Sequence, residues 1–529
     1  MTNHMDNHGS IDFVSAYRST GVSAVLFGLR YSDTPTLRHS FLVKRMFSWN
    51  RQKTLALLRE YECRNITYID PDGSWPIVWK RARGVFVWDS AGQKYLDLTA
   101  GFGVAATGHA NPRVVQAGRR QMGELLHAMG DVHPHALKAQ LARELSRLTF
   151  ERWRQSSAPS HEPGRDGFHS VPDFVQRSKR QFHGRGGTRP YPFKGRMRGL
   201  SVGEASERTR LQGKAIFCNS GFEAVEAALK TALLATGKPG VIAFRGAYHG
   251  TGYGSLNTTH REHFRVPFHS QLGRFGRFVE FPARAGQLEA VESSIRSLLR
   301  SRRIGAILVE PIQGRGGINV PPIGFLPLLR QLCNDINALL ILDEIYTGFG
   351  RTGRWFACEH SGTVPDVICL GKALGGGFPL SACVGRADLM DAAWPASTGE
   401  AIHTSTFLGH PVGCAMALAQ INEIRRRGLV KQSQAMGRVL LEALAGVKST
   451  PPLRILARGV GLMAGLELRL PKGRPATAKT LQAIKEMLHR GFVALPEGEH
   501  ANVISFTPPL TITAFQLQQT VDALRTIFR

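Results

Sequence analysis

The middle of the chain alternates short, continuous apolar runs with segments of helical spacing. The runs are AIFC, VIAF, AILV, ALLIL and VICL, which begin at residues 215, 241, 306, 338 and 367. Unbroken apolar runs of this length are typical of strands that are buried on both faces of a parallel sheet. Because helical segments separate the runs, the pattern predicts β-α-β units and an α/β fold.

The two ends of the chain carry a different pattern. Residues 82–117 alternate as strands around a turn at 89–93, helical spacing follows from 116 to 148, and the part after residue 421 mixes helices with short strands. This pattern predicts a small C-terminal α+β domain, joined by the N-terminal segment. Residues 1–52 fit neither part, and two interpretations remain: a poorly ordered extension, or a start codon chosen too far upstream.

A basic stretch, residues 151–211, interrupts the pattern. It has no sustained periodicity, and Gly, Ser, His and Pro separate its many Arg and Lys residues. Such a composition cannot bury enough apolar surface to order itself. The interpretations are a disordered insertion, sequence translated from a frame error, or an arm that binds an anionic partner.

Composition narrows the function classes. The net charge of +27 is compatible with nucleic acid or with acidic substrates, but the sequence holds no recognisable nucleic-acid module, so nucleic acid is not the expected partner. No apolar run reaches the roughly 20 residues of a membrane helix, and the first residues do not resemble a signal peptide, which predicts a cytoplasmic protein without a membrane partner. The seven cysteines are scattered singly, so no metal site is expected.

Two strand ends carry the candidate chemistry. The run at 338–345 delivers Asp343, and the run at 364–370 is followed by Lys372 and a glycine triplet. The stretch between them is long enough for a crossover that places both strands side by side, with their C-terminal ends at one edge of the sheet. A lysine amine there can bind the aldehyde of pyridoxal phosphate covalently, and a carboxylate can keep the pyridine nitrogen of the cofactor protonated.

These residues lie in the strings LILDEIYTGFGRTG and PDVICLGKALGGGFPLSA. The strings resemble the signature of the class III aminotransferases, a fold-type I group that includes ornithine, acetylornithine and 4-aminobutyrate aminotransferases. The resemblance begins near residue 53. It implies a large domain at 111–415 with a mostly parallel seven-stranded sheet, and a small α+β domain made from 53–110 and 416–529.

The resemblance also implies a reaction. It is transamination (EC 2.6.1.-), in which an enzyme uses pyridoxal phosphate to move an amino group from an amino acid or ω-amino donor to a 2-oxo acid. Two alternatives stay open. An aminomutase or racemase of the same family would leave the amino group on its product, and a basic scaffold would bind RNA or acidic proteins through residues 151–211.

The resemblance assigns roles to individual residues, beginning with Lys372 and Asp343 as the catalytic pair. Ser220 and Glu223 form a capping box that opens a helix, and the family places the cofactor phosphate at such a turn. The expected cofactor contacts are Ser220, Gly221 and Phe222 at this turn, Tyr248 stacked on the ring, Tyr346 beside its 3-oxygen, Asp343 and Lys372 themselves, and Thr406, which reaches the cofactor of a neighbouring subunit. The last contact implies a homodimer with shared active sites.

The substrate clamps of the family are absent. The arginine that holds a glutamate carboxylate is replaced by Ser505, the glutamate that gates it by Arg315, and a further arginine of ornithine-type relatives by Thr251. Because a carboxylate in a partly dry site needs a cationic partner, the hypothesis is that Arg315 binds the substrate carboxylate, with Phe102 as an apolar wall. The alternatives are that Arg315 pairs with an acidic neighbour at the surface and that Phe102 is an ordinary packed aromatic.

Overall fold

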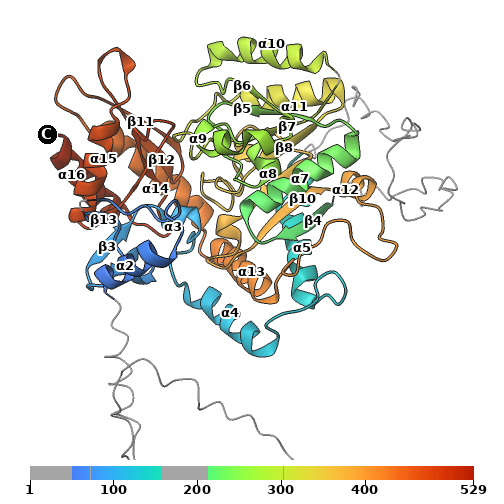
Figure 1. The fold of residues 1–529 in the computed structure, drawn as a ribbon, viewed down its shortest axis with the longest axis horizontal. Coiled ribbons are helices and arrows are strands. Elements are labelled where there is room, and N and C mark those ends of the chain that lie inside the picture. Colours follow the sequence, from blue (N-terminus) through green and yellow to red (C-terminus); the bar gives the residue numbers. More distant parts are fainter. Residues whose placement is uncertain (1–49, 72, 158–211, 302) are drawn as a thin grey trace, which may run out of the picture.

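Residues 50–71, 73–157, 212–301 and 303–529 are described by the computed structural model (Figure 1). Their largest sheet has seven strands in the order β4-β10-β9-β8-β7-β5-β6. Strand β10 is antiparallel to both neighbours and the pairs from β9 to β6 are parallel, which confirms the mostly parallel sheet. The strands are β4 Gly213–Cys218, β5 Gly240–Phe244, β6 Gly276–Val279, β7 Ile304–Val309, β8 Leu339–Asp343, β9 Val367–Leu370 and β10 Ser381–Arg386.

Helices cover both faces of this sheet because its strands are apolar on both sides. Along β8, Leu340 and Leu342 belong to the core cluster that includes α10 and α11, whereas Leu339 and Ile341 pack in the cluster of α7. Successive side chains of a strand point to opposite faces, so a continuous apolar run buries both. The main helices of this large part are α4 Pro112–Glu124, α5 Ala136–Leu148, α7 Gly221–Thr236, α10 Leu288–Leu299, α11 Phe325–Ile336, α12 Ala387–Ala393 and α13 Pro411–Arg426.

The small part combines the first described elements, from α2 to β3, with the C-terminal part of the chain, and the two lie together on the left of Figure 1. Strand β13 pairs in parallel with β3 within the sheet β1-β2-β3-β13, and a second, antiparallel sheet has the order β11-β12-β15-β14. The elements are α2 Arg51–Tyr61, β1 Trp79–Arg83, β2 Phe86–Asp89, β3 Lys94–Asp97, α14 Leu429–Ala445, β11 Arg454–Val460, β12 Met463–Arg469, α15 Thr477–His489, β13 Phe492–Val493, β14 Leu495–Glu497, β15 Val503–Phe506 and α16 Ala514–Phe528.

The expected start of the basic insertion needs a correction. The chain stays helical through α6, Phe150–Ser157, rather than losing order at residue 151. The reason is apolar anchoring, since Trp153 is buried and packs edge-on against Phe150 and Phe356. The rest of the predicted insertion, 158–211, and residues 1–49 of the predicted extension lie outside the described residues.

The structure also bears on the cysteines, on membrane-spanning helices and on metal sites. Each of the seven cysteines is a free thiol, and six of them are buried. Across the described ranges, no helix is long and apolar enough to cross a membrane, and no group of three or more His, Cys, Asp or Glu side chains could hold a metal ion.

Candidate active site

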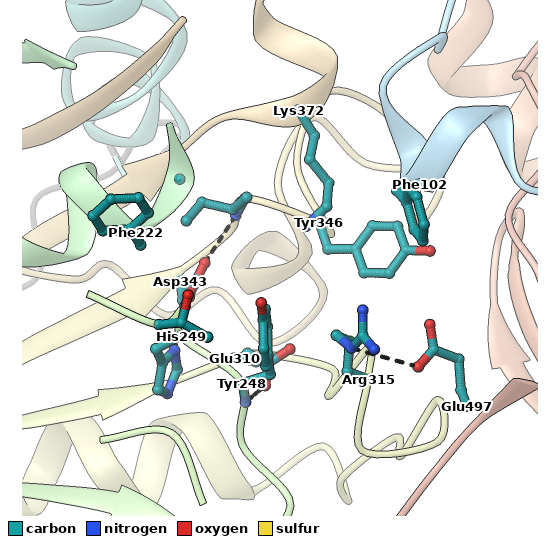
Figure 2. A pocket seen from close by; sticks show the side chains of 14 residues that line it. Phe102, Phe222, Tyr248, His249, Glu310, Arg315, Asp343, Tyr346, Lys372 and Glu497 are labelled. Carbon is teal, nitrogen blue, oxygen red and sulfur yellow. Dashed lines mark hydrogen bonds and ion pairs between the residues drawn. The ribbon is translucent and has the colours of Figure 1, made fainter. Parts of the chain in front are cut away.

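A cavity of about 340 Å3 opens at the C-terminal edge of the large sheet (Figure 2). Strands β7, β8 and β9 end at this edge, and Glu310, Asp343 and Lys372, which close or follow them, line the cavity. Open α/β sheets bind ligands outside the carboxyl ends of their strands, because the loops of several strands converge there. The two strand-end residues indicated by the sequence therefore share one pocket of small-molecule size.

Lys372 begins a short helical turn, Lys372–Leu374, directly after β9. Its φ of 40° lies in the left-handed region, which a residue other than glycine adopts only where the surrounding structure holds it there. Its Nζ lies 4.4 Å from the centroid of the Tyr346 ring. Burial lowers the pKa of Lys372, because the ammonium form loses hydration, and the carboxylates of Asp343 and Glu310 oppose this shift. The lowered pKa makes the neutral, nucleophilic amine more accessible.

Asp343 is held by two donors. The amide of Ile345 donates to Oδ1 at 3.1 Å, and Nδ1 of His249 lies 2.8 Å from Oδ2. Both Asp343 and His249 are buried and line the cavity (Figure 2). The other ring nitrogen of His249, Nε2, is buried without a hydrogen-bond partner in the described part of the chain. Sequence reasoning gave His249 less weight than Tyr248 and assigned it no role, although its position directly after Tyr248 was a signal for one.

Glu310 anchors the loop that carries Tyr248. Its carboxylate accepts hydrogen bonds from the amides of Tyr248 and Gly314, each at 3.0 Å. Burial raises the pKa of Glu310 to about 7, with His249 opposing the rise and Asp343 adding to it. Because Gly314 directly precedes Arg315, this bridge brings the Tyr248 ring and the Arg315 guanidinium together, with 5.1 Å between the ring centroid and the guanidinium carbon.

The N-terminus of α7 opens onto the same cavity. Gly221 and Phe222 line it, and Ser220 is the N-cap. The Glu223 carboxylate accepts hydrogen bonds from the amides of Asn219, at 2.7 Å, and of Ser220, at 3.4 Å. The Ser220 hydroxyl is buried and has no partner among the described groups. An orphaned hydroxyl beside the first amides of a helix is suited to a phosphate.

These features together fit pyridoxal phosphate. The helix N-terminus with the orphaned Ser220 hydroxyl suits the phosphate, the Asp343 carboxylate suits a protonated pyridine nitrogen, and the Lys372 amine suits the aldehyde. The expected residues Gly221, Phe222, Tyr248 and Tyr346 all line the cavity. Thr406 does not, since it lies on an exposed turn between α12 and α13, and its contact with a neighbouring subunit stays a prediction.

Tyr346 and Phe102 line the cavity beside Lys372 (Figure 2). The hydroxyl of Tyr346 is 3.0 Å from Oγ1 of Thr507, and burial raises the pKa of Tyr346 to about 12. Its ring passes close to Gly314, where an added Cβ would lie 2.4 Å from a ring carbon. Phe102 is 53% exposed and lines both this cavity and an adjoining groove of about 1310 Å3. It is therefore a residue of the pocket mouth rather than an ordinary packed aromatic.

Arg315 enters the cavity from the loop after β7. Its Nε lies 4.0 Å from Oε2 of Glu497, the last residue of β14. An acidic neighbour therefore exists, but it is a buried wall of the cavity, 4% exposed, rather than a surface partner. Ser505 and Thr251 stand where the resemblance leads us to expect an arginine that binds a carboxylate. Thr251 lines the cavity. Ser505 does not line the cavity, and its hydroxyl donates to the carbonyl of Leu495 at 3.1 Å. Glu497 is a residue that sequence reasoning missed.

Comparison with known proteins identifies aminotransferases as the relatives of this chain. The family model described as Aminotransferase class-III matches residues 68–157 and 202–528. An acetylornithine aminotransferase of Methanosarcina acetivorans is 32% identical, over 85% of this chain and 92% of its own length. A putrescine aminotransferase of Pectobacterium atrosepticum is 33% identical, over 90% and 89%, and a 5-aminovalerate aminotransferase of Pseudomonas aeruginosa is 32% identical, over 86% and 93%.

Solved structures share the fold. A transaminase from the marine bacterium Virgibacillus superposes with a TM-score of 0.73 at 22% identity, covering 90% of this chain and 98% of its own. An ornithine aminotransferase from Toxoplasma gondii superposes with a TM-score of 0.71 at 24% identity, covering 95% and 98%. The stretch between the two matched segments of the family model, 158–201, falls inside the predicted basic insertion.

Proposed function

Since this chain belongs to the class-III aminotransferases, which use pyridoxal phosphate, we propose that it moves the terminal amino group of a carboxylate-bearing donor to a 2-oxo acid. The observation that carries the proposal is that Arg315 and Lys372 line one cavity. Relatives named for acetylornithine, putrescine and 5-aminovalerate support a terminal amino donor. The relatives favour neither an aminomutase or racemase nor a basic scaffold.

The roles of the residues follow from their chemistry. When bound, pyridoxal phosphate supplies an aldehyde that receives the amino group and a ring that withdraws electrons from the substrate carbon. The Lys372 amine takes the proton from the carbon that bears the reacting amino group and later returns it. The Asp343 carboxylate, oriented by His249, holds a proton on the pyridine nitrogen, and Ser220 with the first amides of α7 binds the phosphate.

The substrate is bound by residues on the side of the cavity that carries Arg315. The Arg315 guanidinium offers a planar set of donors to a carboxylate and is supported from behind by the Tyr248 ring. Tyr346 and Phe102 exclude water from the space between Arg315 and Lys372. This arrangement selects a donor with its reacting amine at one end and its carboxylate at the other.

We also propose an oligomeric state and a cellular location for the enzyme. Thr406 and its neighbours on the exposed turn would complete the phosphate site of a second copy, so the enzyme is proposed to be a homodimer. A cytoplasmic location is carried over from the sequence pattern alone.

A half-reaction tests the function. The holoenzyme is mixed with 5-aminopentanoate without an oxo acid, and the absorbance of the cofactor is followed while the product is analysed. We expect conversion of the cofactor to its amine form with release of the ω-oxo acid. A racemised or rearranged product with an unchanged cofactor would refute transfer.

Arg315→Ala then tests carboxylate binding. Losing a charge-assisted pair worth about 1.5 to 3 kcal/mol should raise KM for 5-aminopentanoate by about one to two decades. Butylamine, which lacks the carboxylate, serves as the control donor and should be unaffected. An unchanged KM for 5-aminopentanoate would remove Arg315 from this role.

A further inference from the structure

Glu497 is a buried carboxylate with an unfilled hydrogen-bonding capacity. Its side chain is 4% exposed, and Oε2 has no hydrogen-bond partner in the described part of the chain. It lines both the cavity of Lys372 and the adjoining groove. A buried anion without a hydrogen-bonding partner is costly, so it is retained where a ligand supplies the missing donor.

Arg315 lies beside Glu497 and also has a polar side-chain atom without a hydrogen-bond partner. The Arg315 Nε is also buried without a hydrogen-bond partner, and the 4.0 Å separation from Oε2 of Glu497 is too long for a hydrogen bond. The backbone fixes this neighbourhood, because the amide of Gly498 donates to the carbonyl of Arg315 at 3.1 Å. The cavity therefore presents one cation and one anion side by side, as Figure 2 shows.

The pair is separated from the reacting amine by an aromatic side chain. Tyr346 lies between Lys372 and Arg315 in Figure 2, and its ring contacts the Lys372 amine. A donor that reaches both ends must therefore place several carbon atoms between its reacting amino group and the group bound by the pair. The end held by the pair needs an anionic and a cationic group close together.

We propose that Arg315 and Glu497 together recognise the zwitterionic head of an α,ω-diamino acid whose ω-amino group reacts at Lys372. Arg315 binds the carboxylate, and Glu497 accepts hydrogen bonds from the ammonium on the same carbon. This inference rests on the proposed function and names its donor class. A simple ω-amino acid leaves Glu497 without its cation, and a diamine leaves Arg315 without its anion. Sites with buried polar groups discriminate strongly against analogues that leave those groups unpaired.

Three donors of matched length separate the two contributions. They are 2,5-diaminopentanoate, 5-aminopentanoate, which lacks the second amine, and 1,4-diaminobutane, which lacks the carboxylate. For the holoenzyme we expect kcat/KM to be at least about tenfold higher for 2,5-diaminopentanoate than for either analogue, since each analogue leaves one of the two side chains without its partner on the substrate. The series is repeated with the chain one carbon longer, and equal values for all three donors at both lengths would overturn the inference.

Glu497→Gln tests the anionic half. It should lower kcat/KM for 2,5-diaminopentanoate by about 10- to 100-fold and that for 5-aminopentanoate by less than about threefold. Glu499→Gln, an exposed glutamate two residues further on, is the matched control and should change neither value. An equal loss for both donors in Glu497→Gln would mean that Glu497 only supports the fold, and would refute the inference.

A binding measurement is independent of turnover and of folding of the variant. The wild-type enzyme carrying the amine form of the cofactor, which cannot accept a second amino group, is titrated calorimetrically with 2-aminopentanoate and with pentanoate. We expect at least about tenfold tighter binding of 2-aminopentanoate, because it retains the complete head. Equal affinities would overturn the inference even if Glu497→Gln did not fold.

The outcomes distinguish this inference from the proposed function. If no donor converts the cofactor to its amine form, the proposed function fails. If 5-aminopentanoate is converted but 2,5-diaminopentanoate is not preferred, the function stands and only the role of Glu497 fails.

Discussion

Nδ1 of His249 lies 2.8 Å from Oδ2 of Asp343, within a buried contact at the end of β8. The pair joins the loop after β5 to the last residue of β8, 94 positions further along the chain. A histidine that is hydrogen-bonded to a carboxylate fixes the orientation of that carboxylate, as the outer groups of metal and catalytic sites do. His249 is therefore expected to act through Asp343 as a positioning residue.

The first prediction concerns Asp343→Asn. The neutral amide cannot stabilise a protonated pyridine nitrogen, so the half-reaction rate should fall by about 10²- to 10³-fold, the size expected for one lost electrostatic contact in a dry site. The measurement is the single-turnover rate at saturating donor. Melting curves serve as the control for folding, and a rate within threefold of the wild-type rate would contradict the assigned role.

The second prediction concerns His249→Gln. Because the amide can still hydrogen-bond to Asp343, the variant should fold and lose at most about tenfold in rate, which corresponds to about 1.4 kcal/mol in the activation barrier. His249→Ala should lose more. In a double-mutant cycle, the change of His249 should have little further effect when Asp343 is already Asn, and full additivity would show that the two residues act independently.

The large sheet could be predicted from the sequence because its strands are continuous apolar runs. The antiparallel direction of β10 could not, since SACVGR has the same composition as a parallel strand and its direction is set by the tight connection from Lys372 to Leu380. The sequence also did not predict the helix α6, because composition averaged over a stretch hides the contribution of a few residues. Two aromatic residues, Phe150 and Trp153, anchor it within a stretch whose average composition is that of a disordered segment.

The candidate site was predictable where residues follow the ends of buried strands, as Asp343 and Lys372 do. Glu497 lies instead in a three-residue strand beside Pro496, and no local pattern marks it. It reaches the cavity because β14 pairs with β15 and the Gly498 amide binds the Arg315 carbonyl. Such long-range contacts are properties of the tertiary structure, so a sequence pattern does not reveal the side chain that faces Arg315.

The third prediction concerns Lys372. Reduction of the holoenzyme with borohydride should attach the cofactor irreversibly to the peptide that contains Lys372, which peptide mass mapping detects. Lys372→Ala should fold, lose the absorbance band near the visible edge and lose at least about 10²-fold in rate, as expected for a missing general base. Attachment to a different lysine would contradict the assignment.

The fourth prediction concerns the phosphate end of the cavity. Ser220→Ala removes the orphaned hydroxyl and should weaken cofactor binding by about tenfold, the effect of one hydrogen bond to a charged group. The measurement is the Kd for pyridoxal phosphate after removal and return of the cofactor. Ser294→Ala, on the exposed side of α10, is the matched control, and equal Kd values for the two variants would exclude Ser220 from the phosphate site.

The last prediction uses stability to separate a ligand-binding role of Glu497 from a structural one. Burial raises the pKa of Glu497 to about 7 from an ordinary value of 4.5, although the cations Arg315, Arg261 and Lys372 oppose the rise. An acid whose pKa is higher in the folded state destabilises the fold as pH rises through that window. The cost is absent below about pH 4.5 and complete above about pH 7, where it amounts to about 1 to 3 kcal/mol.

Glu497→Gln should therefore melt at the same temperature as the wild-type protein at pH 5, and roughly 1 to 4 °C higher at pH 8. If the carboxylate served only to pair with Arg315, its removal would leave a cation unpaired and the variant would melt lower at pH 8, the opposite sign. Adding 2-aminopentanoate at pH 8 should stabilise the wild-type protein more than the variant, because only the wild-type site can pair with the ammonium. If Glu497 lowers the melting temperature without ligand and raises it with 2-aminopentanoate, it behaves as a residue retained for binding rather than for folding.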